Sequence, residues 1–412
     1  MPVATIILAG GQGTRLQPLT THHAKPAISY GGRYRLIDIP ISNSIHSDIR
    51  QIFVITQYLP DELHHHIQNA YQFDSQNPGF VKILSPKKDL NGKTQNYEGT
   101  ADAVRKNLST ILKESSADYF LILAGDQLYN INFHDVIEFA KSKDAELTIG
   151  SIIVPEKDAT RMGLLKIDSH HLVTDFVEKP KDPEILQKFE LSSQDKSLKD
   201  PLYLGSMGMY LFKRETLSSL LNTDTRNDFG YHLITTSVKR GKTSAYIYQG
   251  YWEDIGTISS YYEANLSFIR STKKLNTYDQ NKPIYTRASF LSGPQIKNGM
   301  ISDSIICEGC IIEAKEITNS IIGFCSCIKK NSIIRDTVMM GNHFCDHTEL
   351  GYSIGENCHI EKTIIDEHVQ IGNGVKITNM KNHIHFDGDG IFVREGITII
   401  AAGTKIPDGY EF

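Results

Sequence analysis

A six-residue isoleucine repeat in the last third of the chain limits the fold more than any other feature. Isoleucines recur six positions apart in several runs: Ile306 and Ile312; Ile322, Ile328 and Ile334; Ile354 and Ile360; Ile365, Ile371 and Ile377. This period is typical of a parallel β-helix, in which we expect three short faces per coil to place every sixth residue in one inward stack. An irregular β-sandwich is the alternative. The flat side of a β-helix would pack on another domain or subunit.

The cysteines lie in the same region. All six fall between positions 307 and 358, and Cys307-x-x-Cys310 followed by Cys325-x-Cys327 resembles the spacing of zinc ligands. These cysteines also sit in the short β-repeats, where a small apolar side chain fills an inward position. We therefore predict buried thiols, with a zinc site and disulfides as the alternatives.

The first 270 residues follow a different pattern, in which apolar strand-like runs alternate with longer helical ones. The predicted strands are Thr5–Ala9, Gln51–Thr56, Tyr119–Ala124, Glu146–Ile153, Gly208–Phe212 and Ser244–Tyr248. The predicted helices between them include Tyr58–Ala70, Thr100–Lys113 and Phe133–Ser142. This alternation indicates an α/β domain with a mostly parallel sheet, which binds ligands at the carboxyl ends of its strands.

The chain is long enough for two domains, because its 412 residues exceed the usual size of one. Residues 273–283 are polar and contain three lysines, two asparagines and a proline, which is typical of a linker. We therefore predict an α/β domain over 1–272, a linker over 273–283 and a β-helix over 284–412.

Charge and hydropathy argue against several classes of partner. The net charge of −5 offers no basic footprint for nucleic acid and no polybasic patch for a membrane surface. No run of 18 apolar residues exists, and the apolar N-terminus lacks the basic segment of a signal peptide. We expect a cytoplasmic protein with neither a nucleic-acid nor a membrane partner.

The strongest functional signal is a glycine loop that follows the first strand. Its glycines are Gly10, Gly11 and Gly13. Such glycines let the backbone approach a ligand and take positive φ, and their free N–H groups form an anion-binding concavity. Arg15 and Lys25 bring two cations to the same place. The loop is predicted to hold a triphosphate.

Two other nucleotide-binding loops do not fit. A Walker A loop needs Lys-Ser/Thr directly after its last glycine, whereas Thr14-Arg15 follows Gly13 here. The dinucleotide fingerprint G-x-G-x-x-G is also missing, so Asp38 is interpreted as structural despite its suggestive spacing. An ordinary strand-to-helix turn is the remaining alternative, and Arg15 and Lys25 disfavour it.

Two aspartates are candidate ligands of a divalent cation. Asp126 follows the buried strand Tyr119–Ala124, at the edge where an open α/β sheet binds its ligand. Mg²⁺ usually takes one or two carboxylates together with substrate phosphates. Asp254, in the segment with the single tryptophan Trp252, is the second candidate. Together they would hold Mg²⁺ against the α-phosphate. A helix N-cap is the alternative role for Asp126.

A Gly-Thr turn precedes the predicted helix at 100. Gly99 and Thr100 could lie against a flat ring and read its edge with backbone groups, and Tyr97 could flank that ring. The alternative is a plain helix start with Thr100 as its cap.

Further polar residues stand at strand ends. Glu178 and Lys179 are followed by Pro180, and lysine suits a phosphate while glutamate accepts from sugar hydroxyls. Ser206 precedes another apolar strand near the expected sugar. A surface ion pair is the alternative for Glu178 and Lys179. Asp228-Phe229-Gly230 matches a kinase tripeptide, but no kinase catalytic loop accompanies it.

The chain closely resembles the glucose-1-phosphate adenylyltransferase (ADP-glucose pyrophosphorylase) family along nearly its whole length. The matching segments are LAGGQGTRLQPLT, AKPAISYGGRYRLIDIPISNS, GTADAVR, LAGDQLY, EKP, GSMGMYLF, NDFG, YWEDIGTI and the hexapeptide region beginning PIYTR. Other sugar nucleotidyltransferases share GG-x-GTR and the later lysine. The resemblance implies a Rossmann-like catalytic domain, a left-handed β-helix and a homotetramer.

The resemblance also implies roles for individual residues. Arg15 and Lys25 would neutralise the triphosphate and the leaving pyrophosphate, and Asp126 and Asp254 would hold Mg²⁺. The implied ATP contacts are Gly10, Gly11, Gly13, Thr14, Gly99 and Thr100. The implied glucose 1-phosphate contacts are Tyr97, Gly163, Glu178, Lys179 and Ser206. The sugar phosphate oxygen would attack the α-phosphorus of ATP in line, in a reaction that depends on positioning and charge neutralisation.

Two other functions remain open. The first is uridylyl or guanylyl transfer to another sugar 1-phosphate, because backbone contacts do not reveal the base. The second is a non-catalytic regulatory subunit. Such subunits usually lose a phosphate-loop cation or a metal carboxylate, whereas this chain keeps Arg15, Lys25, Asp126, Lys179 and Asp254.

The departures from the family concern regulation. His22 and His23 replace a basic pair, and Ala402 stands where plant-like members carry an effector lysine. Glu356 and Glu361 replace lysines of those members. An anionic activator would lose charge contacts, so we predict weak or altered activation by phosphorylated metabolites in an otherwise intact enzyme of glycogen or starch synthesis.

Overall fold

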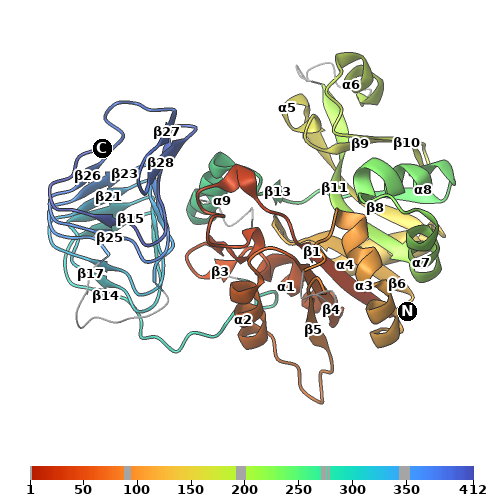
Figure 1. Cartoon of the computed structure of the whole chain (residues 1–412), viewed down its shortest axis with the longest axis horizontal. Coiled ribbons are helices and arrows are strands. Elements are labelled where there is room, and N and C mark those ends of the chain that lie inside the picture. The colour runs from red at the N-terminus through yellow and green to blue at the C-terminus, as the bar shows by residue number, and fades with distance from the viewer. Residues whose placement is uncertain (1, 88–93, 192–200, 271–274, 276–278, 343–352) are drawn as a thin grey trace.

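Two structural regions follow one another along the chain in the computed structural model (Figure 1). The structure describes residues 2–87, 94–191, 201–270, 275, 279–342 and 353–412. An α/β region is followed by a parallel β-helix, and α9 (Ile258–Arg270) lies between the two. Among the described residues we find no helix whose length and hydropathy suit a membrane span.

A nine-stranded sheet forms the centre of the α/β region. Its parallel strands run in the order β6 (Tyr119–Ala124), β1 (Val3–Ala9), β4 (Gln51–Thr56) and β5 (Phe80–Leu84). Beside β6, β11 (Leu202–Lys213) runs antiparallel and also pairs with β8 (Leu147–Pro155), which is parallel to β12 (Thr243–Ile247). A hairpin of β9 (Gly163–Ile167) and β10 (Val173–Glu178) completes the sheet.

Helices cover both faces of this sheet, which makes it a doubly covered α/β layer (Figure 1). Their bounds are α1 (Asp38–His46), α2 (Pro60–Ala70), α3 (Thr100–Glu114), α4 (Phe133–Ser142), α5 (Glu156–Ala159), α6 (Pro183–Phe189), α7 (Arg214–Thr223) and α8 (Thr235–Lys239). Ile6 and Ile7 of β1 belong to different core clusters, because neighbouring residues of a strand point to opposite faces. A strand buried on both faces reads as a continuous apolar run, as β1 does.

The predicted elements agree with these bounds, with one larger difference. Gln51–Thr56, Tyr119–Ala124 and Phe133–Ser142 match, and most others differ at an end by one or two residues. The predicted strand Gly208–Phe212 is only the second half of β11, which begins at Leu202. Its register shifts between Ser206 and Met209, and Gly208 has a φ of +70° there, so the alternation that signals a strand is interrupted.

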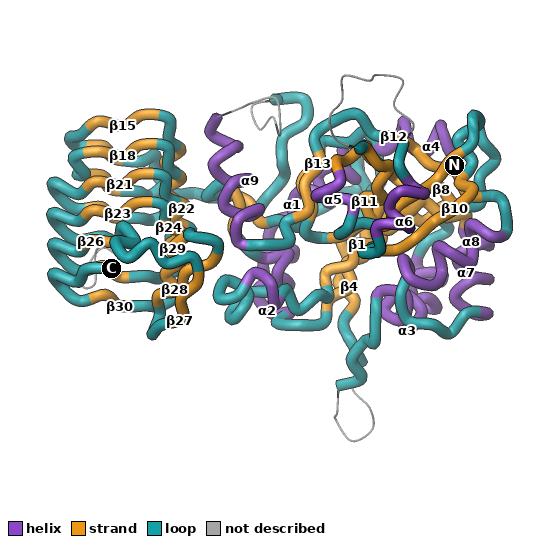
Figure 2. Tube along the Cα trace, turned by 90° about the horizontal axis from the view of Figure 1, so that it is seen from above, coloured by secondary structure: helices purple, strands orange, loops and turns teal. Residues whose placement is uncertain are grey.

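The C-terminal region is a parallel β-helix whose short strands stack in ladders (Figure 2). One face consists of β15 (Met300–Ser302), β18 (Glu316–Thr318), β21 (Ile333–Arg335), β23 (His359–Glu361) and β26 (Lys376–Ile377). A second contains β16 (Ile305–Ile306), β19 (Ile321–Ile322), β22 (Val338–Met339), β24 (Thr363–Ile365) and β29 (Ile397–Ile400), extended by the antiparallel strands β28 (Ile391–Arg394) and β27 (His385–Asp387). The third contains β14 (Gln295–Ile296), β17 (Ile311–Ile312) and β20 (Cys327–Ile328), and β25 (Gln370–Ile371) pairs with β30 (Lys405–Ile406).

The isoleucine repeat has the predicted period but not the predicted stacking. Ile322, Ile328 and Ile334 are buried on three different faces, so a step of six leads to the next face of the same coil. A stack on one face recurs once per coil, as in the pairing of Ile312 with Ile328. The expectation that every sixth residue joins one stack is therefore wrong, because each coil consists of three steps of five or six residues, one for each face.

The cysteines are mostly buried thiols, as predicted, with one exception. Cys307, Cys310, Cys327 and Cys358 are free and buried. Cys325 is disulfide-bonded, and its partner lies outside the described residues. The prediction of thiols without covalent links is therefore wrong at Cys325. Within the described ranges, no group of metal-ligating side chains contains a cysteine.

The β-helix packs against the α/β region, as we predicted from the flat side that a β-helix presents. Ile364 and Ile399 of the β-helix share a hydrophobic cluster with residues of the α/β region. The Tyr262 hydroxyl of α9 donates to the Asp336 carbonyl at 2.5 Å. The predicted linker 273–283 lies partly outside the described residues, so the structure leaves its bounds as a prediction.

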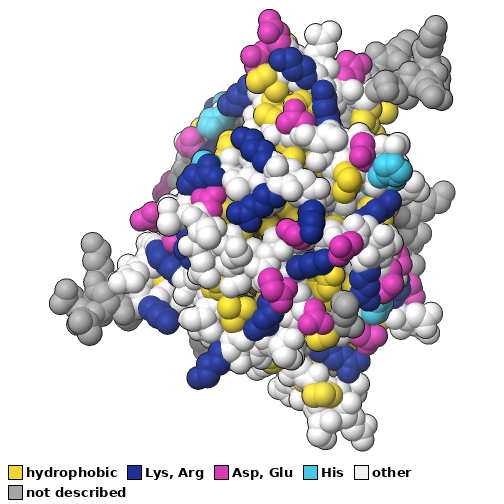
Figure 3. Space-filling view, turned by 90° about the vertical axis from the view of Figure 1, so that its right-hand side faces the viewer, with side chains coloured by type: hydrophobic (Ala, Val, Ile, Leu, Met, Phe, Trp, Pro, Cys, Tyr) yellow, Lys and Arg dark blue, Asp and Glu magenta, His cyan; other side chains and the backbone are white. Residues whose placement is uncertain are grey.

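One face of the molecule shows how charge is distributed. Figure 3 views the end of the α/β region far from the β-helix, where Lys and Arg side chains alternate with Asp and Glu. This face carries no continuous patch of one sign.

Candidate active site

The glycine loop and Asp126 meet at the carboxyl edge of the sheet. Leu8 of β1 pairs with Ala124 of β6, and the Gly125 amide donates to the Leu8 carbonyl at 3.1 Å. Lys25, at the start of the 3-10 turn Lys25–Ala27, is buried and places its Nζ 2.5 Å from Asp126 Oδ2. The two residues therefore form a close ion pair at this edge.

Asp254 reaches the same point through a short antiparallel ladder. Strand β13 (Trp252–Asp254) pairs with β7 (Gln127–Tyr129), with Asp254 opposite Gln127. Burial raises the pKa of Asp254, the nearby Asp126 charge raises it further, and Lys25 and Arg15 oppose this. The N-cap alternative for Asp126 is wrong, because a strand follows it instead of a helix.

The three loop glycines differ in their roles. Gly13 alone takes positive φ, at +64°, and a Cβ there would lie 2.8 Å from Thr20 Cγ2. Gly10 and Gly11 do not adopt positive φ, contrary to the prediction, and Gly11 has open space where its Cβ would be. Gly10 and Gly11 line the central cavity, whereas Gly13 and Thr14 are not among its lining residues.

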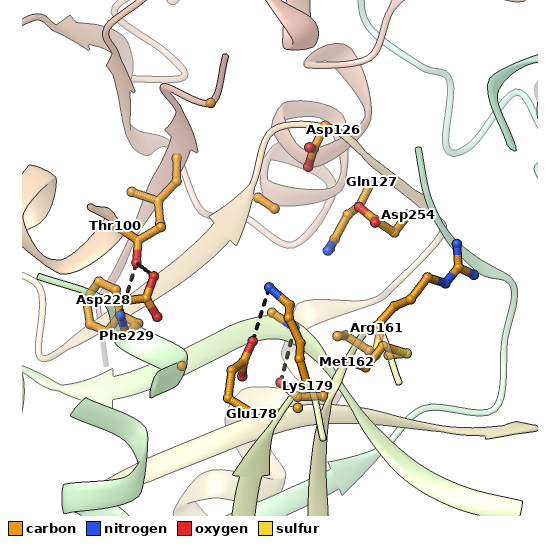
Figure 4. A pocket seen from close by; sticks show the side chains of 18 of the residues that line it. Thr100, Asp126, Gln127, Arg161, Met162, Glu178, Lys179, Asp228, Phe229 and Asp254 are labelled. Carbon is orange, nitrogen blue, oxygen red and sulfur yellow. Dashed lines mark hydrogen bonds and ion pairs between the residues drawn. The ribbon is translucent and has the colours of Figure 1, made fainter. Parts of the chain in front are cut away.

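A cavity of about 1200 Å³ opens over this edge. It brings together most of the residues that the sequence singled out: Gly10, Gly11, Arg15, Lys25, Tyr97, Gly99, Thr100, Asp126, Gly163, Glu178, Lys179, Ser206 and Asp254. Figure 4 shows Asp126, Gln127 and Asp254 on one side, with Glu178 and Lys179 facing them across the cavity.

Arg15 lies beside the Asp254 carboxylate. A Cβ at Gly256 would be 3.1 Å from Asp254 Oδ2 and 3.4 Å from an Arg15 guanidinium nitrogen. Gly256 therefore leaves room for both charged groups. Arg15, Lys25, Asp126 and Asp254 form one cluster of two cations and two carboxylates, which we call the metal-side cluster.

The Gly-Thr turn is bound to the segment Asn227–Phe229. The Ala101 amide donates to the Asn227 carbonyl at 2.9 Å, and the Phe229 amide donates to Thr100 Oγ1 at 3.0 Å. A Cβ at Gly99 would overlap the Asn227 carbonyl oxygen. Helix α3 does begin at Thr100, but its N-cap is Gly99, so the alternative of Thr100 as the cap is wrong.

Glu178 and Lys179 stand at the end of β10. Burial raises the pKa of the Glu178 carboxyl. A Cβ at Gly163 would lie 2.8 Å from its Oε2, so Gly163 makes room for this carboxylate. Lys179 Nζ lies 3.3 Å from Glu178 Oε1, and the backbone φ of Lys179 is +47°.

Tyr97 and Ser206 are fixed in the cavity wall by local hydrogen bonds. The Tyr97 amide donates to Gln57 Oε1 at 2.7 Å, and its hydroxyl accepts from Asn107 Nδ2 at 2.9 Å. Ser206, at the irregular point of β11, is buried and accepts from the Gly208 amide at 3.3 Å.

Asp38 has the structural role that the sequence indicated. Its buried carboxylate lies 2.6 Å from His66 Nε2 and accepts from the Tyr71 hydroxyl and the Arg35 amide at 2.5 and 2.8 Å. It is not among the residues that line the cavity.

Several cavity residues were not predicted. They include Gln57, Gln127, Asp158, Arg161, Tyr231 and Trp252. Gln57 follows β4, so the rule that ligands bind at carboxyl strand ends could have found it. Arg161 lies in the turn before β9, and no sequence pattern marked it, because only the fold brings that turn to the cavity.

Another group could in principle hold a metal ion. Within the described ranges, His23, Glu62 and Glu367 place one ligand atom each within 4.8 Å of one another. However, Arg35 lies between the acids, with its guanidinium nitrogens 3.0 Å from Glu62 Oε1 and 2.9 Å from Glu367 Oε1. The arginine thus already fills the cation's position.

Comparison with protein families agrees with this geometry. Residues 4–271 match the family model described as nucleotidyl transferase, which covers more than half of the chain. The chain belongs to the nucleotidyl transferase family. Residues 289–410 match the model described as the GLGC left-handed parallel beta-helix domain, so the β-helix is of the left-handed type. The fold is therefore the predicted one, a nucleotidyltransferase domain followed by a left-handed parallel β-helix.

Proposed function

We propose that this nucleotidyltransferase transfers AMP from ATP to glucose 1-phosphate, giving ADP-glucose and pyrophosphate. One observation carries the proposal. The metal-side cluster faces the Glu178–Lys179 pair across a single cavity, so that a triphosphate and a sugar phosphate can meet there. The choice of ATP and glucose 1-phosphate among nucleotides and sugars comes from the resemblance of the motifs to one family.

The metal-side cluster fits a divalent cation. The Asp126 carboxylate is close enough to Asp254 for its charge to raise the pKa of Asp254. Two such carboxylates are the hard-oxygen donor set that Mg²⁺ takes with substrate phosphates. Bound Mg²⁺ would polarise the α-phosphate and neutralise developing charge. We propose Asp126 and Asp254 as its protein ligands.

The remaining chemistry is positioning and charge neutralisation. A sugar phosphate oxygen attacks the α-phosphorus, and the bond from that phosphorus to the oxygen of the β-phosphate breaks. Arg15 and Lys25 compensate the charge of the departing pyrophosphate, while Lys179 holds the sugar phosphate and Glu178 accepts from sugar hydroxyls. Gly99 and Thr100 lie where the base would be held, with Tyr97 beside them.

Pyrophosphate release measured for each nucleoside triphosphate against each of several sugar 1-phosphates tests the proposal. We expect the highest kcat/KM for ATP with glucose 1-phosphate. A higher value for UTP or GTP would replace the proposal with uridylyl or guanylyl transfer. Turnover with none of the pairs would favour a non-catalytic subunit.

The proposed assembly is a homotetramer in the cytoplasm, which takes ATP and glucose 1-phosphate as its partners. Light scattering coupled to size-exclusion chromatography measures the mass directly. A monomer at micromolar concentration would contradict the tetramer.

A further inference from the structure

A second cation stands next to Lys179 on the same hairpin. The Lys179 amide donates to the Met162 carbonyl at 3.1 Å, and Glu178 pairs with Gly163. This register places Arg161, directly before Met162, beside the end of β10. The β9–β10 hairpin therefore carries Lys179 and Arg161 at one end.

Both side chains reach the cavity. Arg161 and Lys179 line it, and Figure 4 shows Lys179 with its Nζ turned toward Glu178 and Arg161 extending on the side where Asp254 lies. Asp126 and Asp254 line the same cavity, so Arg161 and the metal-side cluster border one space.

The ion pair that holds Arg161 is local and open to solvent. Arg161 pairs with Asp158, three residues earlier, and their side chains are 52% and 28% exposed. Exposed pairs of this kind contribute about 0–1 kcal/mol at most to stability. A substrate phosphate, which accepts two parallel hydrogen bonds from a guanidinium, would compete well for Arg161.

We infer that Arg161 is a further substrate-binding residue. Its guanidinium breaks its ion pair with Asp158 and binds the phosphate of the sugar 1-phosphate together with Lys179. The inference rests on the proposed function. The two cations differ in what they offer. Lys179 supplies a point charge, whereas Arg161 supplies a planar fork that also fixes the orientation of the phosphate against the metal-side cluster.

Steady-state kinetics of Arg161→Gln with ATP and glucose 1-phosphate test this inference. We expect the KM for glucose 1-phosphate to rise about 10- to 100-fold, the range for losing a hydrogen bond between charged groups, with little change in the KM for ATP. Lys179→Ala should raise the same KM, and Arg161→Lys should recover part of the loss.

Two further variants separate substrate binding from a structural role. Asp158→Asn breaks the ion pair but keeps the guanidinium, so the KM for glucose 1-phosphate should stay or fall. Arg335→Ala is the matched control, since Arg335 is a 41% exposed arginine of the β-helix that pairs with Glu316. It should leave all constants unchanged.

The outcomes also separate the two proposals. If the wild-type enzyme releases no pyrophosphate from any pair, the proposed function fails and this inference fails with it. If the wild type is active but Arg161→Gln leaves the KM for the sugar phosphate unchanged, only the inference is overturned. An equal rise of the KM for glucose 1-phosphate in Asp158→Asn and Arg161→Gln would also overturn the inference, because that result indicates that the ion pair has a structural role.

Discussion

At the scale of single residues, the 2.5 Å contact between Lys25 and Asp126 is the centre of the proposed site. The contact joins a loop lysine to the end of β6. In the proposed reaction, Asp126 holds the cation and Lys25 compensates phosphate charge, so both groups act on the phosphates of the substrate.

We predict that Asp126→Ala lowers kcat by about 10³-fold or more, which corresponds to roughly 4 kcal/mol of activation free energy. The physical reason is the loss of a ligand from a donor set of two carboxylates. Pyrophosphate release at saturating substrate measures it. Asp389→Ala, at an exposed aspartate of the β-helix, is the control. Turnover of Asp126→Ala near the wild-type level would remove Asp126 from the mechanism.

Asp254 should show a conflict between stability and activity. Its pKa is raised in the folded protein, first by burial and then by Asp126, so the folded state holds the Asp254 proton more tightly than the unfolded state does. Its ionisation therefore costs stability as pH rises above the ordinary pKa of about 3.9.

We accordingly predict that Asp254→Asn increases the free energy of unfolding at pH 7 while it abolishes turnover. The gain should shrink as pH falls toward about 4 and be absent below it, where the wild-type carboxyl is protonated in both states. Denaturant unfolding at several pH values measures this. A less stable Asp254→Asn protein at pH 7 would show that the charge is fully compensated in the folded state.

At the scale of elements, the start of α3 depends on a contact that sequence spacing does not reveal. The Asn227 carbonyl lies so close to Gly99 that only glycine fits, and it accepts from the Ala101 amide. The segment from Asn227 to Phe229 is thus a support for the Gly-Thr turn, which explains a tripeptide that otherwise suggests a kinase.

We predict that Gly99→Ala moves this turn and raises the KM for ATP about 10-fold, because a Cβ must displace backbone from a preformed ligand site. Gly293→Ala is the matched control, since its Cβ would meet nothing within 4 Å. The two KM values and the melting temperatures are measured together. An unchanged KM for ATP in Gly99→Ala would argue against a role of this turn in nucleotide binding.

At the scale of the whole molecule, a buried charged cluster joins the two regions. His23 Nδ1 lies 2.7 Å from Glu62 Oε2, and its Nε2 lies 3.5 Å from Asp366 Oδ1 of the β-helix. Arg35 bridges Glu62 and Glu367. We call these five residues the interdomain cluster. His23 lies two residues before Lys25 in the sequence. Through Asp366, the β-helix therefore contacts the segment that carries a predicted catalytic lysine.

His23 makes this contact dependent on pH. Burial alone would lower its pKa, but the neighbouring Asp366 and Glu62 carboxylates raise it to about 10. Because the folded pKa exceeds the unfolded value, the stabilisation is complete below about pH 6.5 and is lost as pH rises toward about 10. We predict a steeper fall in unfolding free energy between these pH values for the wild type than for His23→Gln. Urea unfolding at several pH values measures this. Equal slopes of unfolding free energy against pH in the two proteins would contradict the prediction.

The interdomain cluster also bears on the predicted regulation. Three carboxylates, from Glu62, Asp366 and Glu367, surround His23 and Arg35. The Gly403 amide donates to the Glu367 carbonyl at 2.9 Å, so Ala402 lies in the neighbouring segment. This acidic surrounding would repel an anionic effector.

We therefore predict less than about twofold activation by 3-phosphoglycerate or fructose 1,6-bisphosphate, well under 1 kcal/mol of coupling. Pyrophosphate release at subsaturating substrate, with and without each compound, measures it. Strong activation by either compound would show that the effector site uses other cations.

The sequence by itself determined the α/β domain, the β-helix and most of the predicted site. A short apolar run such as Gln51–Thr56 is typical of a strand that is buried on both faces. The isoleucine period is typical of a β-helix coil with three faces. Asp126 could be found because parallel strands bring their carboxyl ends to one edge. Lys179 follows β10, which is antiparallel to its neighbour β9, so only its residue type at a strand end pointed to it.

Only the tertiary structure decided what depends on contacts between distant segments. The stacking of Ile312 on Ile328, the support of Gly99 by Asn227, and the placement of Arg161 and Asp254 in one cavity each join segments whose relative placement no local pattern encodes. The same holds for the interdomain cluster. Periodicity and turn chemistry act over a few residues, whereas these contacts depend on how complete elements pack.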